Sequence, residues 1–459
     1  MNGGGGRDPQ DGTPGSGSPE QGRATPAGDG IEAPPAVIWI VRTLEERGFE
    51  TWAVGGAVRD ALLGHPSGDW DLATRAHPKD VRRVFERTIP VGIEHGTVGV
   101  LARDGVMYEV TTFRRDVETD GRHAVVSFAH HIEDDLARRD FTINAIAWHP
   151  LTRRILDPFR GRDDLEARLL RTVGVAAERF REDYLRVLRA FRFAGRFDLR
   201  VEAETWTAAL AVVDRLPGLS AERIRDELVK VLEAVTPSRA LELYADSGAL
   251  AVLYPELEAR RADLLARDPA ASVSVSEWDL CTASVDRLPP ENPLLRLAAL
   301  LRGLAHSDAA AVLMRLRLSN AQVDRTLRQA TAADLPAPDA DDSEFRRWLS
   351  RTGPDVWPVA AALQLAVAHT RVELGCGAEG EPAGLEASWI RARAVSDAKP
   401  PLSVGDLELD GRDLIRLGLK PGPRFGAILE SLLESVLDDP EMNRHEILSA
   451  KVRQELVDE

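Results

Sequence analysis

The chain has 459 residues, of which 44% are hydrophobic, and a formal net charge of −16 at pH 7. This length exceeds what one hydrophobic core usually organises, so we expect a multidomain protein. The negative charge argues against broad, nonspecific adhesion to nucleic acid, and any RNA contact must come from local basic patches. The two cysteines, Cys281 and Cys376, exclude a disulfide framework and favour a reducing, cytoplasmic location.

The sequence shows no pattern that predicts secretion or membrane spanning. No charged n-region followed by an apolar h-region opens the chain. The more apolar stretches, such as residues 356–369, are short and interrupted by polar residues or proline. We therefore expect no membrane partner.

Residues 1–35 predict a disordered N-terminal tail, because they are rich in Gly, Pro, Ser and acids. They contain almost no apolar residue to offset the entropy of ordering. From Ala36 onwards, apolar residues at helical spacing predict a helix that Gly48 ends. Residues 51–54 then predict a short strand, so folded structure is expected to begin here.

A glycine pair, Gly55 and Gly56, follows this strand in the run V-G-G-A-V-R-D. At a turn from strand to helix, backbone N–H groups can approach a phosphate because no Cβ intervenes. Arg59 lies in the first turn of the expected helix, where its guanidinium would add bidentate donors suited to a triphosphate. Taken alone, such a turn is more often a simple connection.

Two aspartates, Asp69 and Asp71, lie in the run G-D-W-D-L-A-T, which predicts a strand. Since side chains alternate along a strand, the two carboxylates would project from the same face. An isolated D-x-D is more often a solvated strand edge. The other interpretation is a site for a hard cation such as Mg²⁺, which prefers oxygen ligands and removes the repulsion. The glycine turn directly upstream favours the cation site.

These two motifs resemble the head of a nucleotidyltransferase family that contains class II CCA-adding enzymes and bacterial poly(A) polymerases. Three further segments resemble the family's motifs in the family's order: R-R-D-F-T-I-N-A at 138–145, L-D-P-F-R-G at 156–161 and E-D-Y-L-R-V-L-R-A-F-R-F at 182–193. The resemblance covers roughly residues 52–200, and these motifs would almost never occur in this order by chance.

The resemblance implies a mixed α/β, polymerase-β-like head followed by an all-α neck, body and tail. We place the head at residues 36–172, the neck at 173–262, the body at 263–400 and the tail at 401–459. Beyond residue 200 the apolar spacing is almost entirely helical.

The body resembles an HD-type metal phosphohydrolase domain that has lost its metal ligands. Residues 277–282 and 295–303 resemble the two opening helices of that domain. Leu280 stands where the first histidine would be needed, and Arg302-Gly303 stands where the His-Asp pair would be needed. We expect a degenerate HD-like body without phosphohydrolase activity.

Asp183, Arg186, Arg189 and Arg192 recur every three residues and would form one stripe along a helix. An acid and an arginine one turn apart are usually a surface pair. The resemblance implies instead that Asp183 and Arg186 read cytosine and adenine, whose amino donor lies next to a ring-nitrogen acceptor. Uracil and guanine invert that order. The resemblance also implies that Arg189, Arg192 and Arg139 contact phosphate or sugar.

The implied reaction is attack of an RNA 3′-hydroxyl on the α-phosphate of CTP or ATP, with two Mg²⁺ ions on Asp69 and Asp71. Glu109, in a run at 106–114 that alternates like a strand, is a candidate third carboxylate. An ordinary strand glutamate fits that position equally well. The implied partner is the tRNA 3′ end, and the sequence does not predict an oligomeric state.

Three functions remain open. The first is a tRNA nucleotidyltransferase that adds CCA, or only CC or A. The second is a poly(A) polymerase acting on other RNAs. Many bacterial poly(A) polymerases end in a strongly basic extension, whereas this chain ends in E-L-V-D-E. The third is a catalytically silent RNA-binding protein, and the intact Asp69, Asp71 and Arg59 argue against it.

Overall fold

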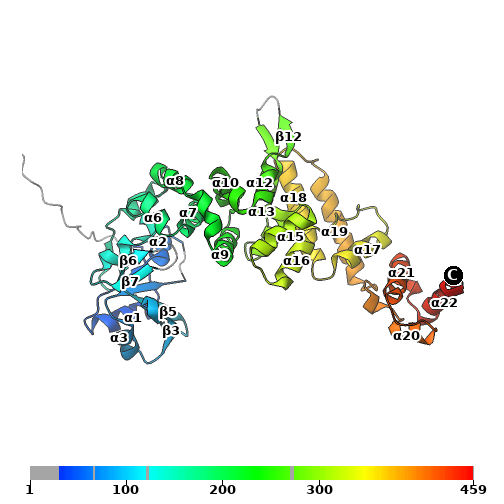
Figure 1. The fold of residues 1–459 in the computed structure, drawn as a ribbon, viewed down its shortest axis with the longest axis horizontal. Helices are drawn as coiled ribbons and strands as arrows, with labels where there is room; N and C mark the ends of the chain where they lie inside the picture. The colour runs from blue at the N-terminus through cyan, green and yellow to red at the C-terminus, as the bar shows by residue number, and fades with distance from the viewer. Residues whose placement is uncertain (1–29, 66–67, 120–123, 269–272, 458–459) are drawn as a thin grey trace, which may run out of the picture. The chain divides into compact units, whose positions relative to one another are not determined.

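The computed structural model describes residues 30–65, 68–119, 124–268 and 273–457. The chain divides into two compact units, Met1–Val175 and Ala176–Glu459. Figure 1 shows the first in blue to cyan and the second in green to red. Most of the tail expected at 1–35 lies outside the described residues. Ile31, however, is only 2% exposed and the first helix begins at Pro35, so order starts before Ala36.

A seven-stranded sheet with the order β3-β4-β5-β2-β1-β8-β9 forms the centre of the first unit. β2 and β5 are parallel neighbours and the other pairs are antiparallel, so the sheet is mixed as expected. Its strands are β1 (Thr51–Val54), β2 (Asp71–Thr74), β3 (Thr88–Gly92), β4 (Thr97–Leu101), β5 (Met107–Thr112), β8 (Ala147–His149) and β9 (Arg154–Leu156).

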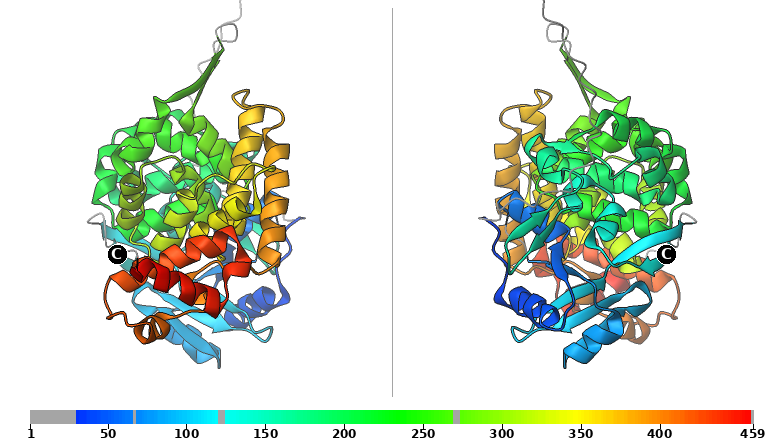
Figure 2. Two further views of the ribbon diagram at one scale, coloured as in Figure 1. Left: turned by 90° about the vertical axis from the view of Figure 1, so that its right-hand side faces the viewer. Right: turned by 90° about the vertical axis from the view of Figure 1, so that its left-hand side faces the viewer.

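Short helices and a hairpin complete the first unit. α1 and α3 pack side by side and against the sheet, as Figures 1 and 2 show. The remaining elements are α1 (Pro35–Glu45), α2 (Gly56–Leu62), α3 (Pro78–Val84), η1 (Ile93–His95), β6 (Arg114–Thr119), β7 (Ala124–Phe128), α4 (Ile132–Ala137), η2 (Thr142–Asn144), α5 (Gly161–Glu166) and β10 (Leu169–Leu170).

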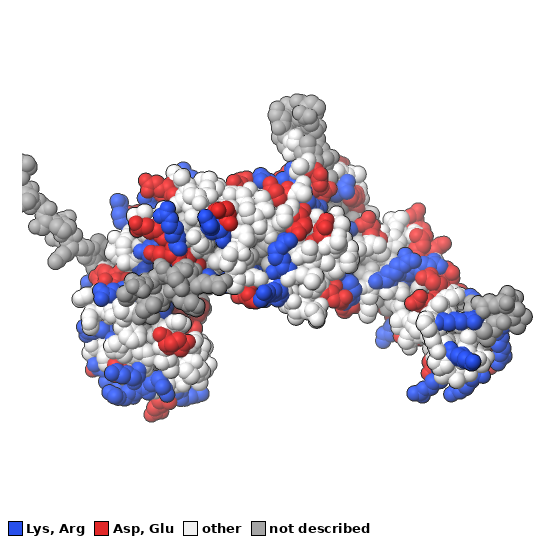
Figure 3. Space-filling view, in the orientation of Figure 1, with Lys and Arg blue, Asp and Glu red and all other residues white. Residues whose placement is uncertain are grey.

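Apolar side chains from the sheet and α4 form a core that includes the end of β1, just before the glycine turn. Trp52 and Val54 of β1 pack with Ala73 of β2, Phe113 and Leu136, all of which are buried. This core fixes the strand ends from which the glycine turn and the aspartates emerge. Exposed basic side chains gather over α3, where Lys79, Arg82 and Arg83 face solvent (Figure 3).

The second unit is mostly helical. Its helices are α6 (Ala176–Glu182), α7 (Leu185–Phe197), α8 (Ala203–Leu210), η3 (Val213–Gly218), α9 (Ala221–Leu232), α10 (Ser238–Asp246), α11 (Ala249–Leu253), α12 (Pro255–Glu258), η4 (Ala259–Arg261), α13 (Glu277–Asp286), α14 (Pro293–Leu301), α15 (His306–Arg315), α16 (Asn320–Ala330), α17 (Asp342–Thr352), α18 (Trp357–Glu373), α19 (Glu381–Asp397), η5 (Val404–Asp406), α20 (Gly411–Arg416), α21 (Arg424–Asp438), η6 (Pro440–Met442) and α22 (His445–Val457).

The expectation of an all-α second half was wrong, because β12 (Leu264–Asp268) and β13 (Val273–Ser276) form an antiparallel hairpin. Alternating valines and serines in β13 carry a strand pattern that the helical spacing around it obscured. β11 (Arg200–Val201) is a second short strand. The finer division into neck, body and tail stays a prediction. None of the helices in the described ranges combines the length and apolar character needed to cross a bilayer.

Candidate active site

The chain turns from β1 into α2 at Gly55, and this turn lies against two other predicted site residues. Gly55 has a φ of +73°, which side-chain-bearing residues rarely adopt. A Cβ at Gly55 would lie 2.8 Å from Arg139 Nη1 and 3.8 Å from Asp71 Oδ2. The close approach therefore requires glycine at 55. Gly56, the second residue of the predicted pair, begins α2, and a Cβ there would make only an ordinary contact with Arg59.

The prediction that Asp69 and Asp71 share one strand was wrong. β2 begins at Asp71, so Asp69 lies before the strand. The reason is that Asp71 pairs with Val54, the last residue of β1, and the chain then leaves the ladder at Gly55. No β1 backbone remains to pair with Asp69. The two carboxylates nevertheless interact, and the negative charge of Asp69 raises the pKa of Asp71.

Glu109 lies beside Asp71 on the neighbouring strand. β2 and β5 are parallel, and Leu72 pairs with Val110, so the residues just before them occupy adjacent positions on one face. Burial is the main cause that raises the pKa of Asp71 to about 6; the charges of Asp69 and Glu109 act in the same direction, and that of Arg139 opposes them. The sheet thus places Asp71 and Glu109 side by side, and Asp69, just before β2, acts electrostatically on Asp71.

These carboxylates fit a divalent cation. The raised pKa of Asp71 means that its ionised form lacks compensating charge, which a cation bound to oxygen ligands would supply. In the described ranges, no three His, Cys, Asp or Glu side chains lie close enough to enclose a metal ion. Substrate phosphates and water commonly complete the ligands of Mg²⁺ in such sites. The arrangement therefore suits a metal that arrives with a nucleotide.

Arg139 is held at the site by a buried acid that sequence reasoning missed. Arg139 Nη2 lies 3.3 Å from Asp135 Oδ2, and Arg138 Nε lies 3.2 Å from the other oxygen. Although burial raises the pKa of Asp135, Arg139 and Arg138 bring it below its ordinary value. Asp135 lies on α4, four residues before Arg139, which follows the end of that helix, and that spacing was the available signal. The Nε of Arg139 is buried without a hydrogen-bond partner, which leaves one donor for a ligand.

Arg59 lies deeper than its expected place on a triphosphate. Its side chain is buried, with Nη1 donating to Asn144 Oδ1 at 2.5 Å and Nε donating to Asp60 Oδ1 at 2.8 Å. Asn144 in turn donates to Asp140 Oδ1 at 3.0 Å. Arg59 thus ties α2 to η2. The sequence motif contained Asp140 and Asn144, but their pairing with Arg59 could not be read from it.

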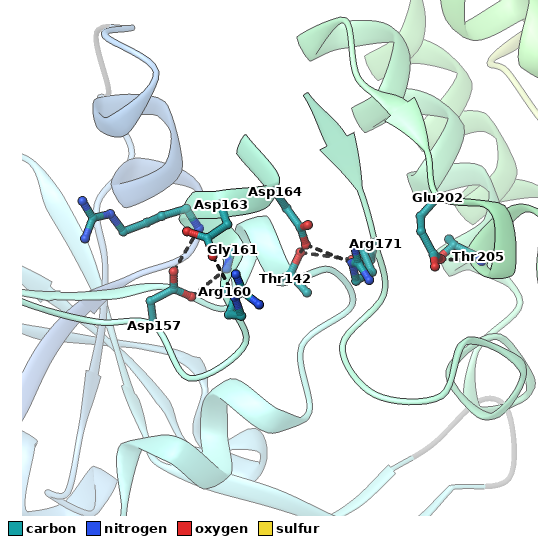
Figure 4. Close-up of polar contacts among 10 residues, drawn as sticks. Thr142, Asp157, Arg160, Gly161, Asp163, Asp164, Arg171, Glu202 and Thr205 are labelled. Carbon is teal, nitrogen blue, oxygen red and sulfur yellow. Dashed lines mark hydrogen bonds and ion pairs between the residues drawn. The ribbon is translucent and has the colours of Figure 1, made fainter. Parts of the chain in front are cut away.

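The L-D-P-F-R-G segment and the start of α5 lie against Thr142 of η2, as Figure 4 shows. Asp157 accepts hydrogen bonds from the main-chain N–H groups of Gly161 and Arg162, at 2.7 and 2.9 Å, and so starts α5. Thr142 Oγ1 donates to Asp164 Oδ2 at 2.7 Å. A Cβ on Gly161 would lie 2.1 Å from the Thr142 carbonyl oxygen. This segment therefore packs tightly on the turn that carries Asn144.

In the second unit, the expected single stripe is broken, because Asp183 lies outside α7, the helix that carries the three arginines. α6 ends at Glu182 and α7 begins at Leu185, so Asp183 lies between them. Asp183 Oδ1 accepts a hydrogen bond from the Leu185 N–H at 3.0 Å, and such a side-chain turn competes with the helical backbone. Asp183 Oδ2 lies 2.7 Å from Arg223 Nη2.

The three arginines of the stripe each have an acidic partner. Glu182 Oε2 lies 2.5 Å from Arg186 Nη1. Arg192 Nε donates to Glu227 Oε2 at 2.6 Å, and both side chains are buried. Arg189 Nη1 lies 3.8 Å from Glu227 Oε1, and its side chain is half-buried. Glu227 was missed, although an acid between apolar positions on α9 is a visible signal.

Within the part of the chain that the structure describes, no cluster of metal-ligating side chains surrounds the residues that stand in place of the HD ligands. Leu280 is buried in α13, and Arg302 follows the last residue of α14. The guanidinium of Arg260 donates to the Arg302 carbonyl oxygen at 2.5 Å and to Glu277 Oε2 at 2.7 Å. The degenerate HD-like body stays a prediction.

Comparisons with known proteins identify the family. Residues 51–171 match the family model described as the Poly A polymerase head domain, and residues 198–260 match the probable RNA and SrmB-binding site of polymerase A. A CCA-adding enzyme of Geobacillus kaustophilus (strain HTA426) is 36% identical over 417 residues, which cover 90% of this chain and 95% of that protein. This chain belongs to the CCA-adding enzyme family.

Other CCA-adding enzymes extend the similarity. That of Streptococcus sanguinis (strain SK36) is 42% identical over 254 residues, covering 54% of this chain and 63% of that protein. The crystal structure of the Bacillus stearothermophilus CCA-adding enzyme in complex with CTP is 33% identical and covers 92% of this chain and 96% of that one, with a TM-score of 0.71. The Thermotoga maritima CCA-adding enzyme complexed with tRNA, at 22% identity and a TM-score of 0.55, shares the fold.

Membership in the CCA-adding enzyme family confirms several predictions. The polymerase-β-like head with a mixed sheet and the mostly helical remainder are confirmed. The chain is a nucleotidyltransferase, so the silent RNA-binding protein is set aside. The family also implies a divalent metal in nucleotidyl transfer, which agrees with the fit of the head carboxylates.

Proposed function

We propose that this chain adds C and A residues from CTP and ATP to the 3′ end of tRNA, without a template and with Mg²⁺. The observation that carries the proposal is the similarity to CCA-adding enzymes over nine-tenths of the chain, head and helical unit alike. The carboxylates beside the glycine turn give this similarity a chemical basis in the head.

In the proposed reaction, the tRNA 3′-hydroxyl oxygen bonds to the α-phosphorus of the nucleotide, and the bond from that phosphorus to pyrophosphate breaks. Asp69 and Asp71 would hold Mg²⁺, which when bound lowers the pKa of the hydroxyl and neutralises charge on pyrophosphate. Arg139, whose Nε is a buried donor without a partner, would bind the triphosphate or ribose beside Gly55 and Gly56. The burial of Arg59 supports a positioning role for it, through Asn144.

We assign base selection to Asp183 and Arg186. Asp183 would accept from the amino group of cytosine or adenine, and Arg186 would donate to the neighbouring ring nitrogen. A donor that faces a donor in uracil or guanine costs ~1 to 3 kcal/mol per mismatch. Arg189, which is half-buried, would contact phosphate or sugar. The same contact by Arg192 would require its guanidinium to leave Glu227, so we propose that Arg192 instead fixes α7 on α9.

The test is incorporation of each labelled nucleotide, CTP, ATP, UTP or GTP, with Mg²⁺ into a tRNA transcript that lacks its 3′ CCA. The proposal predicts incorporation of CTP first and rejection of UTP and GTP. Asp69→Ala and Asp71→Ala should each abolish incorporation while tRNA binding persists. Activity comparable to that of the unsubstituted enzyme in both variants would overturn the metal assignment.

A poly(A) polymerase that acts on other RNAs shares the same head chemistry and is the second candidate. The family model for the head carries that description. Its products would differ, because it would make long A tails on RNAs of many kinds. The cytoplasmic location stays a prediction that rests on cysteine usage.

A further inference from the structure

Helix α9 places two side chains of opposite charge against the segment that carries the base-selecting residues. Arg223 Nη2 lies 2.7 Å from Asp183 Oδ2, and Glu227 Oε2 lies 2.6 Å from Arg192 Nε. Arg223 and Glu227 are four residues apart, so they project from the same face of α9. At one turn of α9 the basic Arg223 pairs with the acidic Asp183, and at the next turn the acidic Glu227 pairs with the basic Arg192.

The pair between Glu227 and Arg192 fixes the alignment of the two helices. Glu227 is 2% exposed and Arg192 is 6% exposed, so separating them would leave a buried charge without its partner. α7 and α9 pack against each other, as Figure 1 shows. Because this buried pair resists sliding of one helix along the other, Arg223 is held in register with Asp183 one turn away.

The place of Arg223 in α9 is unfavourable for the helix by itself. α9 begins at Ala221, so Arg223 is its third residue, where a capping box would place Glu or Gln. The helix dipole also favours negative charge in this first turn. The ion pair with Asp183 is partly exposed, and such pairs contribute ~1 kcal/mol or less to stability. Stability alone therefore gives no reason for an arginine at this position.

We propose that Arg223 is a positioning residue that sets the direction of the Asp183 carboxylate for base selection. The inference rests on the proposed function, in which Asp183 reads the base. Leu185 N–H binds Oδ1 and Arg223 binds Oδ2, so both oxygens are directed before a base arrives. Without Arg223 the Asp183 carboxylate keeps only its hydrogen bond from the Leu185 N–H and can rotate. Cytosine and adenine then lose a fixed acceptor, and uracil and guanine lose part of the mismatch that excludes them.

The experiment compares Arg223→Ala, Arg223→Lys and Arg225→Ala by the kcat/KM of CTP, ATP, UTP and GTP on tRNA. Arg225 is the matched control, since it lies on α9 and binds Asp226 and the Arg317 carbonyl oxygen. Arg223→Ala should lower the preference for CTP over UTP by about tenfold. Arg223→Lys should recover part of it, and Arg225→Ala should keep it. An unchanged preference, or an equal fall for all four nucleotides, would overturn the proposal.

A double-substitution test shows whether Arg223 acts through Asp183. In an Asp183→Ala background, Arg223→Ala should cause no further change in nucleotide preference. If Arg223→Ala lowered the nucleotide preference of the Asp183→Ala variant as much as it lowers that of the unsubstituted enzyme, Arg223 would not act through Asp183. If Arg223→Ala fails to fold, Arg223→Lys carries the comparison. If the unsubstituted enzyme used neither CTP nor ATP, the proposed function itself would be overturned. If the unsubstituted enzyme and Arg223→Ala selected CTP and ATP over UTP and GTP equally well, only this inference would be overturned.

Discussion

The Arg59 guanidinium donates to Asn144 Oδ1 over 2.5 Å and joins two motifs that lie 85 positions apart in the chain. Asn144→Ala removes the acceptor of Nη1 of the buried Arg59 and should lower the free energy of unfolding by about 1 to 3 kcal/mol. Misplacement of the glycine turn should also lower kcat/KM by about 10- to 100-fold. Chemical denaturation and incorporation assays measure both effects.

The matched control is Asn292→Ala, which removes the cap of α14 in the second unit. It should cost about 1 kcal/mol in stability and leave kcat/KM unchanged. Equal activities in the Asn144→Ala and Asn292→Ala variants would contradict a positioning role for Asn144.

The raised pKa of Asp71 predicts a pH-dependent gain in stability for Asp71→Asn. Because the pKa is about 6 in the folded chain against an ordinary 3.8, the stability that protonated Asp71 contributes is complete below 3.8 and is lost as the pH rises through 6. Above pH 6, the free energy of unfolding of Asp71→Asn should therefore exceed that of the unsubstituted chain by on the order of 2 kcal/mol. At pH 4 this advantage should vanish. Thermal unfolding across this pH range measures it.

The exposed Asp214 provides the control, since Asp214→Asn should give no such gain. Excess Mg²⁺ should raise the melting temperature of the unsubstituted protein, and Asp71→Asn should lose that shift. If Asp71→Asn increased the free energy of unfolding equally at pH 4 and pH 8, burial and neighbouring acids would not be raising the pKa of Asp71.

Gly161→Ala should destabilise the first unit, because the new Cβ would lie 2.1 Å from a main-chain oxygen, that of Thr142. Overpacking against backbone costs about 1 to 3 kcal/mol or more. Gly92→Ala is the comparison, since nothing lies within 4 Å of a Cβ there. Thermal unfolding should separate the two variants, and similar melting temperatures would contradict the close packing of α5 on η2.

Glu227→Ala leaves the buried Arg192 without its carboxylate and should lower the free energy of unfolding by about 3 to 5 kcal/mol. Replacing both partners with leucine should cost less than Glu227→Ala alone, since no buried charge is then left without a partner. Glu222→Ala, on the same helix but exposed, should change stability by ~0.5 kcal/mol or less. If Glu227→Ala proved as mild as Glu222→Ala, the pair would not lock α7 to α9.

The outcome for individual residues shows what local pattern can predict. Alternation in the run around Glu109 predicted its strand, and the parallel pairing of β2 with β5 then placed it beside Asp71. The start of β2 could not be predicted, because it depends on where the partner strand ends, at Val54. Likewise, the three-residue spacing after Asp183 suggested one helix, whereas a single side-chain hydrogen bond to Leu185 N–H divides it.

Contacts between distant segments lay beyond sequence reasoning. The burial of Arg59 on Asn144 depends on how η2 packs on α2, and no periodicity records that packing. Glu227 is different, since an acid on the apolar face of α9 could have been recognised as the partner of a buried base. The family motifs predict the chemistry, and the tertiary pairings show which of their residues, such as Arg59 on Asn144, are buried against other parts of the chain.

The most direct test follows nucleotide addition, with all four nucleotides and Mg²⁺, to tRNA transcripts that lack CCA, CA or A, alongside an unstructured RNA. The account predicts that the transcript lacking CCA gains C, C and A, that the one lacking CA gains C and A, and that the one lacking A gains only A. Addition should stop at the completed CCA end and should not occur on the unstructured RNA. Long A tails on either RNA would contradict it and identify a poly(A) polymerase.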